Sequence, residues 1–407
     1  MGQHLLPMLP ISQRMENAMK TMAMVYKLCC KGIMNTTGMH FFLECLLPSP
    51  AQKQKSIEIL KLGSTINRLR MRSFMIFWVL MMGMGMVLEA QNLHITYYTE
   101  ARGLPSNQVR HVAQDDYGFV WIAGDGGLVR FDGLEFTDYT QQIPSQYGRY
   151  LCKTEEGLLL SHDAGISLIK PELDTARISI FMEASIDPGE EALYYPGNIF
   201  QAQNGNLWIS QPGGRITLIQ GDEMIEISAD PADQGNSDID AFFAELDKGL
   251  IAIAFSSGGM YLYDNSSQKL EKIASFSMVN ELKAKGRELW VAGRHIQRIE
   301  LNEEGGQIID RQIFDTNLGE VSTLALDNQG NIYAGIKDKG LYYLERRDDR
   351  EPAFVKIFSS NDRHSVNERP FKNIQKILPE SVDRLWICSS EGLGILQRRF
   401  FESIGSI

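Results

Sequence analysis

The sequence predicts an all-β fold: a seven-bladed β-propeller of four-stranded antiparallel blades over residues 91–407, behind an N-terminal signal or anchor segment. Three observations carry this prediction: a strand pattern that recurs seven times, Asp-Gly and Asn-Gly turns between short apolar runs, and a tryptophan that returns in one slot of the repeat. Four antiparallel strands in about 40 residues make one propeller blade.

Composition separates residues 1–90 from the rest of the 407-residue chain. Of its 18 Met, 14 lie at or before Met86. Residues 1–90 hold 10 of the 40 Lys and Arg and 4 of the 51 Asp and Glu, which leaves 30 against 47, a net charge of −17, for residues 91–407. Because a nucleic-acid binder needs a basic face to displace counterions, we expect no nucleic-acid partner.

Residues 71–90 have the pattern of an export signal. Arg68, Arg70 and Arg72 precede the sixteen uncharged residues Ser73–Leu88, and the small residue Ala90 follows. A basic stretch, an apolar stretch and a small residue at the cleavage point are typical of a secretory signal, and a bilayer-spanning helix needs about 20 residues. Since Leu88 is large for its position before the cleavage point, a retained anchor is the alternative. The sequence therefore predicts a periplasmic or extracytoplasmic protein, attached to the inner membrane only through residues 71–90 and only if they are uncleaved.

Residues 1–70 read as an irregular leader with no sustained helical or strand period. Because signal peptides stand at the start of a protein, we expect translation to begin at Met71 and residues 1–70 to be a mis-assigned extension. The alternative is a genuine, unusual leader.

The clearest repeat unit, Gly103–Thr140, reads as four short strands. The expected strands are Gln108–Gln114, Phe119–Gly124, Leu128–Phe131 and Leu134–Thr140, joined by DDYG, DGG and DG turns. Glycine accepts the positive φ that such tight turns require. We accordingly interpret Asp115 and Asp116 as turn residues and not as a catalytic pair.

The unit recurs over the rest of the chain. The second-strand slot reads FVWIA, LLLSH, NLWIS, LIAIA, ELWVA, NIYAG and RLWIC, beginning at Phe119, Leu158, Asn206, Leu250, Glu288, Asn331 and Arg384. Four of the five tryptophans share one position of this slot: Trp121, Trp208, Trp290 and Trp386. We expect them to pack between blades. Residues His94–Thr99 are the expected closing strand of the last blade, with Phe400–Ile404 in a neighbouring strand position, since closure removes exposed sheet edges.

Residues 97–140 resemble the two-component regulator propeller repeat. The resemblance rests on the pattern GL-x-SN-x-V, D-x-x-G-x-x-WI and GL-x-R-x-DG within Gly103–Gly133, and it extends in eroded form over residues 91–407. That family forms the periplasmic sensor part of hybrid two-component systems and related membrane regulators, chiefly in Bacteroidetes. The resemblance implies a first sensor propeller alone, because family members usually carry a second propeller, a β-sandwich, a membrane helix and an output module.

No sequence motif for catalysis or metal binding emerges. The 7 His lack ligand spacing, and neither a GxSxG elbow nor a P-loop occurs. Gly124–Gly127 read as a hairpin turn and not as a nucleotide loop. The sequence thus predicts a non-enzyme without cofactor or metal; whether Cys152 and Cys388 pair is left open.

Candidate ligand-binding residues lie on the innermost strands, where each V-x-x-V pattern leaves two residues least committed to packing. The candidates around the channel mouth are Arg110, His111, Arg149, Tyr150, Gln375 and Lys376. Arg110 and Arg149 fall on adjacent blades and could clamp a carboxylate or sulfate group. The alternative is that each arginine is solvated or pairs with one of the many Asp and Glu.

The sequence favours a non-catalytic sensor of a small molecule or oligosaccharide, which acts with missing downstream sensor or kinase domains or as a homodimer. Two alternatives remain open: an interaction scaffold at the cell envelope, and a carbohydrate-active propeller enzyme.

Overall fold

The computed structural model divides the chain into two units, Met1–Gln91 and Asn92–Ile407. It describes residues 92–185, 193–302, 306–314, 317–347, 350–359, 371–381 and 384–399. The predicted leader, the signal or anchor segment and the predicted strand Phe400–Ile404 lie outside the described residues. Among the described residues, no helix has the length and apolar character needed to cross a bilayer.

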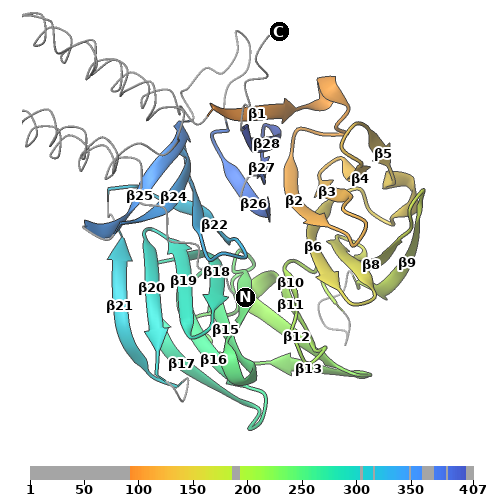
Figure 1. Cartoon of the computed structure of the whole chain (residues 1–407). Coiled ribbons are helices and arrows are strands. Elements are labelled where there is room, and N and C mark those ends of the chain that lie inside the picture. Colours follow the sequence, from red (N-terminus) through yellow and green to blue (C-terminus); the bar gives the residue numbers. More distant parts are fainter. Residues whose placement is uncertain are drawn as a thin grey trace, which may run out of the picture. The chain divides into compact units, whose positions relative to one another are not determined.

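Seven sheets of four antiparallel strands follow one another around a central axis (Figure 1), so the predicted fold is confirmed. The innermost strands are β2 (Val109–Gln114), β6 (Gly148–Thr154), β10 (Ile199–Gln201), β14 (Ala241–Glu245), β18 (Val279–Lys285), β22 (Val321–Leu326) and β26 (Ile374–Ser381). The second strands are β3 (Val120–Gly124), β7 (Gly157–His162), β11 (Leu207–Gln211), β15 (Leu250–Phe255), β19 (Glu288–Gly293), β23 (Ile332–Ile336) and β27 (Arg384–Ser389). The third strands are β4 (Gly127–Phe131), β8 (Gly165–Pro171), β12 (Arg215–Gln220), β16 (Gly259–Asp264), β20 (Ile296–Leu301), β24 (Gly340–Arg347) and β28 (Gly392–Arg399).

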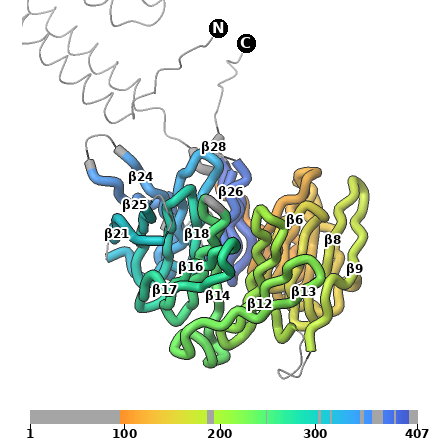
Figure 2. The backbone as a smooth tube through the Cα atoms, turned by 90° about the horizontal axis from the view of Figure 1, so that it is seen from below, coloured from red at the N-terminus to blue at the C-terminus, as the bar shows by residue number. Residues whose placement is uncertain are grey.

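The outermost strands are β5 (Phe136–Asp138), β9 (Ala176–Glu183), β13 (Glu223–Ile227), β17 (Lys269–Ser275), β21 (Ile308–Phe314), β25 (Arg350–Ser359) and β1 (Asn92–Tyr98). Among the described connections, four contain a single-turn 3-10 helix: Glu100–Arg102, Thr140–Gln142, Pro212–Gly214 and Asp247–Gly249. In the view turned by 90° (Figure 2), β9 and β21 lie at the outer edges of the propeller and β6 and β18 lie nearer its middle.

The predicted outer strand of the first blade is shorter than expected. We expected Leu134–Thr140, but β5 covers only Phe136–Asp138. The Asp132 carboxylate accepts hydrogen bonds from the backbone N–H groups of Leu134 and Glu135, which holds the first of these residues in the turn. At the other end the chain turns into the 3-10 helix that begins at Thr140.

The last blade is closed by the N-terminal strand, as predicted. Strand β1 pairs antiparallel with β28, from Asn92 opposite Arg399 to Tyr98 opposite Leu393. The Tyr97 hydroxyl donates to the carbonyl of Glu391, and the Tyr97 ring meets Phe371 edge-on at 5.0 Å between centroids. Closure joins the two ends of the repeat array and protects β28 from acting as an open sheet edge.

The core consists of seven apolar clusters, each lying between two neighbouring blades. Trp121 packs between the first two blades, Trp208 between the third and fourth, and Trp290 between the fifth and sixth. Trp386 contacts Phe131 of the first blade, with ring centroids 5.8 Å apart. The repeated tryptophan therefore packs between blades, as the sequence predicts.

Gly127 offers a test of how closely the first blade is packed. It begins β4 with φ +106°, and its Cα faces the Thr140 side chain. A Cβ atom at Gly127 would lie 2.1 Å from the Thr140 Oγ1, whereas at Gly133, with φ +104°, it would meet nothing within 4 Å. We expect Gly133→Ala to cost about 1 kcal/mol, from backbone strain alone. Gly127→Ala adds a steric clash and should cost about 3 kcal/mol. Urea unfolding of both variants tests this, and equal losses would contradict it.

Candidate functional site: the channel ring

A β-bulge recurs near the start of five innermost strands. In each case one extra residue separates two that pair regularly with the second strand: Arg110, Arg149, Asn280, Ser322 and Gln375. A bulge re-aims the side chains on either side of it. The sequence grouped the two residues inside each V-x-x-V pattern as least committed to packing. In the structure the first of them is the bulged residue, and the second pairs regularly with the neighbouring strand. That interpretation was wrong for two of the four second residues, since His111 is only 7% exposed and Thr323 is fully buried.

The bulged arginines, Arg110 and Arg149, each pair with an aspartate of their own blade. The Arg110 Nε lies 2.6 Å from the Asp125 Oδ1. The Arg149 Nη2 lies 2.7 Å from the Asp163 Oδ1. Both aspartates stand in the turn between the second and third strands. The alternative that the arginines pair with acidic residues is therefore what the structure shows.

Two of the other bulged residues, Asn280 and Ser322, bind the next blade. The Asn280 amide donates to the Val321 carbonyl at 2.9 Å, and the Ser322 hydroxyl donates to the Ile374 carbonyl at 2.6 Å. Asn198, just before β10, makes the same kind of contact to the Ala241 carbonyl at 2.8 Å. These bonds tie together the starts of neighbouring inner strands.

One residue from each blade stands at the same level of the central channel. We call this set the channel ring: His111, Tyr150, Asn198, Phe242, Glu281, Thr323 and Lys376. Six of them lie opposite the residue two positions after the tryptophan slot: Ala123, Ser210, Ala254, Ala292, Gly335 and Cys388. In the second blade the slot is displaced by one residue from the position that the sequence predicts, and Tyr150 lies opposite Ser161. The propeller symmetry thus gathers residues that are widely separated in the sequence.

The channel ring is bridged from side to side by one lysine. Lys376 of the seventh blade lies 2.6 Å from the Glu281 Oε2 of the fifth, and its Nζ lies 5.1 Å from the Tyr150 ring centroid. Tyr150 in turn lies against His111, with ring centroids 3.9 Å apart and ring planes tilted by 38°. The Thr323 hydroxyl is 3.2 Å from the same Glu281 oxygen. The polar groups therefore meet across the channel.

Two lysines share the single carboxylate of Glu281. Lys283, two residues along β18, places its Nζ 3.2 Å from the Glu281 Oε1. Burial alone would raise the pKa of Glu281, but Lys283 and Lys376 outweigh it and hold the pKa below its ordinary value. Burial, aided by the same two lysines, keeps the pKa of His111 well below its ordinary value, so this imidazole is neutral. The cluster consequently carries one surplus positive charge.

His111 is unusual among the ring members. Both of its ring nitrogens are buried and have no hydrogen-bond partner among the described residues. Buried polar groups in native proteins are nearly always paired, so this imidazole is an exception.

A cavity of about 320 Å³ borders the channel ring on the side of β10, β14 and β18. Four ring members line it: Tyr150, Asn198, Phe242 and Glu281. Beyond them, Phe200 contributes an aromatic side chain, Lys283 a cation, and Gln201 and Glu245 polar groups. The cavity therefore combines apolar faces with a few polar groups, as small-molecule sites do.

The sequence candidates include three of the seven members of the channel ring. The sequence predicted His111, Tyr150 and Lys376, which the fold brings together, and Gln375, which lies half-buried at the bulge beside Lys376. It missed Asn198, Phe242, Glu281 and Lys283. Aligning every repeat on the tryptophan slot, and not on the V-x-x-V pattern, would have found the first three of these.

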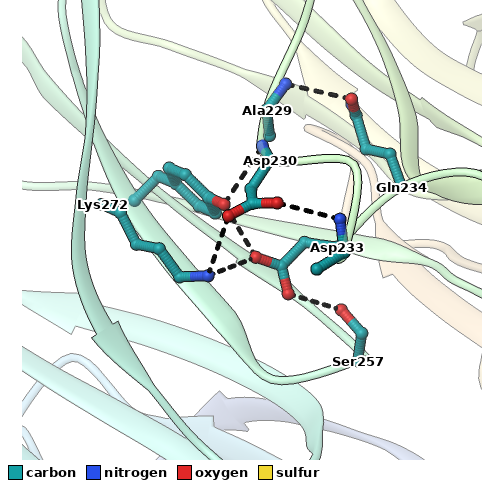
Figure 3. Close-up of polar contacts among 8 residues, drawn as sticks. Ala229, Asp230, Asp233, Gln234, Ser257 and Lys272 are labelled. Carbon is teal, nitrogen blue, oxygen red and sulfur yellow. Dashed lines mark hydrogen bonds and ion pairs between the residues drawn. The ribbon is translucent and has the colours of Figure 1, made fainter.

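A second buried carboxylate, Asp233, has a structural role (Figure 3). It accepts from the Tyr261 hydroxyl and the Lys272 Nζ, both at 2.7 Å, and from the Ser257 hydroxyl at 3.1 Å. Burial would raise the pKa of Asp233, but these three bonds lower it. Because its oxygens are engaged, the cluster fixes the connection from β13 to β14 onto the fourth blade.

Neither a metal site nor a disulfide was found in the described part of the chain. No group of three His, Cys, Asp or Glu there could hold a metal ion. Cys152 and Cys388 are free thiols, and burial raises the pKa of Cys152 to about 11. This answers the question of pairing that the sequence left open.

A comparison with protein families supports the resemblance that the repeat shows. Residues 103–126 match the family described as two component regulator propeller. The extracellular domain of the hybrid two component system BT3049 from B. thetaiotaomicron is similar in structure, with a TM-score of 0.58 and 15% identity over 75% of this chain and 42% of that chain. No curated protein sequence matches the chain.

Two further solved structures extend the comparison. The extracellular domain of the one component system BT4673 from B. thetaiotaomicron has a TM-score of 0.54 and 19% identity over 76% of this chain and 40% of that chain. YCF48 from Cyanidioschyzon merolae has a TM-score of 0.52 and 11% identity over 72% of this chain and 97% of that chain. The chain spans about two fifths of the two extracellular domains. Residues 103–126 are thus a two component regulator propeller repeat, within a propeller that shares the fold of these extracellular regulator domains.

Proposed function

We propose that the propeller is the extracytoplasmic, ligand-sensing domain of a two-component or one-component membrane regulator and that it binds a small molecule or glycan without catalysis. The single observation that carries this proposal is the channel ring with its adjoining cavity. Six inner strands supply a cluster of charged and aromatic groups that includes a buried histidine, His111, for which the described part of the chain offers no hydrogen-bond partner. The fold shared with extracellular regulator domains supports the placement outside the cytoplasm.

The pairing of acidic groups supports a role without catalysis. Among the described residues, the buried carboxylates Asp115, Asp233 and Glu281 each accept several hydrogen bonds or ion pairs. A general acid or base needs a carboxyl group that can exchange its proton with a substrate. Three carboxylates held in this way are suited to fixing the structure.

Binding in the channel can be transmitted because the site belongs to several blades at once. A ligand that prefers one arrangement of these blades shifts the population toward it, by as much as its affinities for the two arrangements differ. A second copy of the chain, or downstream sensor and kinase domains, would receive this shift.

A thermal-shift screen of the full chain tests the proposal. The library contains neutral, acidic and basic mono- and disaccharides and small organic acids. A ligand at about 100 times its Kd stabilises the folded state by about 2.7 kcal/mol, so at least one compound should raise the Tm saturably. Mass spectrometry should recover that compound unchanged. No stabilising compound would contradict sensing, and conversion of the compound would contradict the non-enzymatic role.

An envelope scaffold is the second candidate, and exposed apolar residues favour it. Ile309 and Ile313 on the outer strand β21 are 58% and 52% exposed, and Ile180 on β9 is 53% exposed. Such residues on outer strands could contact a protein partner. A scaffold would gain no stability from any compound of the screen.

A further inference from the structure

We infer that the cavity beside the channel ring binds a sugar acid, a single hydroxylated ring that carries one carboxylate, with the carboxylate against Lys283. This inference rests on the proposed function and names its ligand class. It follows from the charge, the lining and the size of the cavity.

The second cation beside Glu281 favours a singly charged anion at that point of the cavity. Lys376 is 12% exposed, and its Nζ lies 2.6 Å from one carboxylate oxygen of Glu281. Lys283 is more exposed, at 30%, and its Nζ lies farther from the other oxygen of that carboxylate, at 3.2 Å. Lys283 therefore has hydrogens left for a ligand. A phosphate ester would bring two negative charges beside the buried Glu281, which like-charge repulsion disfavours.

A second acidic group of the lining restricts where a ligand carboxylate can lie. Glu245 is a negative group of the cavity, and its Oε2 accepts the backbone N–H of Gln203 at 2.8 Å. A ligand carboxylate avoids this side, but ligand hydroxyl groups can donate to it. The amide groups of Asn198 and Gln201 add further polar partners. The lining accordingly favours a body with several hydroxyl groups.

The apolar lining and the volume favour one ring. Phe200, Phe242 and Tyr150 present aromatic side chains to the cavity. A pyranose ring has apolar C–H faces that pack on aromatic groups. A cavity of about 320 Å³ is at the lower end of the range for ligand pockets, about 300–1,000 Å³, which suits a monosaccharide and not a long oligosaccharide.

Isothermal titration calorimetry with the full chain tests the inference. The probes are D-glucuronate and D-galacturonate, with D-glucose as the neutral control and benzoate as an acid without hydroxyl groups. We expect at least one sugar acid to bind with a Kd at least tenfold lower than that of glucose or benzoate. Equal affinity for glucose would overturn the role of the carboxylate, and equal affinity for benzoate would overturn the hydroxylated body. Failure of both sugar acids to bind would overturn the inference altogether.

Variants then locate the site. Lys283→Met leaves the Lys376–Glu281 pair intact and should weaken sugar-acid binding at least tenfold, while Lys283→Arg keeps the charge and should retain binding. The matched control is Lys153→Met, because Lys153 is 52% exposed and pairs with Asp116 away from the ring. An unchanged Kd for Lys283→Met would overturn the assignment. If the library screen finds only neutral or basic ligands, the sensor proposal stands and the sugar-acid inference fails, so the two failures are distinguishable.

Discussion

Glu281→Gln should lower the free energy of unfolding by about 3 to 5 kcal/mol, because removing one partner of a buried ion pair leaves the other charge uncompensated. Glu281 is 5% exposed and holds both Lys376 and Lys283. The glutamine keeps the shape and one acceptor oxygen, so the loss reports the missing charge and not a cavity. Urea unfolding at pH 7 measures it.

The double variant Glu281→Gln/Lys376→Met is the control for this prediction. With the buried ammonium group removed as well, most of the lost stability should return, because Lys283 is exposed enough to remain solvated. The double-mutant cycle gives the coupling between the two groups directly. A loss of less than about 1 kcal/mol in the single variant, the range of a surface pair, would show that water screens the channel ring.

The pH dependence adds a second readout. The pKa of Glu281 is lower in the folded state than its ordinary value of 4.5, so its contribution is fully present above pH 4.5 and is lost as the pH falls through the folded pKa. The pKa of His111 is also depressed, from 6.5, so the unfolded chain takes up a proton first and stability decreases as the pH falls below 6.5. Wild type should lose stability in both windows, and Glu281→Gln only in the upper one.

The sequence predicted the fold well because propeller geometry repeats locally. Six of the seven turns before the second strand have a glycine at a fixed place, and Gly118 and Gly205 share φ +86°. Each blade needs a large apolar residue between itself and the next, and Trp121 and Trp208 are fully buried there. Such requirements act within about 40 residues, so they leave a periodic trace that can be read without a structure.

The site was harder to predict because it depends on register across blades. Lys376 and Glu281 are 95 residues apart, and their contact requires that both follow a bulge at the same level of the channel. A bulge adds one residue without any signal in the composition. The sequence therefore did not show that Arg110 lies in the bulge while His111 pairs with Ala123 of the second strand. Charge pairing is a second reason, because an arginine beside an aspartate turn can pair with that turn, as Arg110 does with Asp125.

Asp115→Ala should cost about 3 to 4 kcal/mol, since it leaves a buried indole N–H without an acceptor and removes two turn hydrogen bonds. One Asp115 oxygen accepts the backbone N–H groups of Tyr117 and Phe119 at 3.0 and 2.9 Å, and the other accepts the Trp121 Nε1 at 2.8 Å. Asp116→Ala is the matched control: this neighbour is 81% exposed and pairs only with Lys153, so its loss should stay below about 1 kcal/mol. Urea unfolding compares the two variants.

The third blade offers the reverse experiment, because it lacks this acid. The Trp208 Nε1 is buried without a hydrogen-bond partner in the described structure, and Ala202 stands where the first blade has Asp115. The two turns have the same pair of backbone hydrogen bonds. In the third blade the Ala202 N–H donates to the Asn206 carbonyl and the Gly205 N–H to the Ala202 carbonyl, both at 2.9 Å. In the first blade the Asp115 N–H donates to the Phe119 carbonyl at 3.0 Å and the Gly118 N–H to the Asp115 carbonyl at 3.2 Å. Ala202→Asp should therefore supply the missing acceptor and raise stability by about 1 to 2 kcal/mol.

Ala202→Val separates hydrogen bonding from packing, since it adds volume at the same buried position without an acceptor. Only the aspartate should shift the Trp208 indole proton downfield in the NMR spectrum and raise the urea midpoint. If Ala202→Asp destabilises the propeller as much as Ala202→Val does, the indole of the third blade is out of reach of this position. In that case the equivalence of the turns does not extend to their side chains, and the acid in the first blade stabilises its own turn more than the tryptophan.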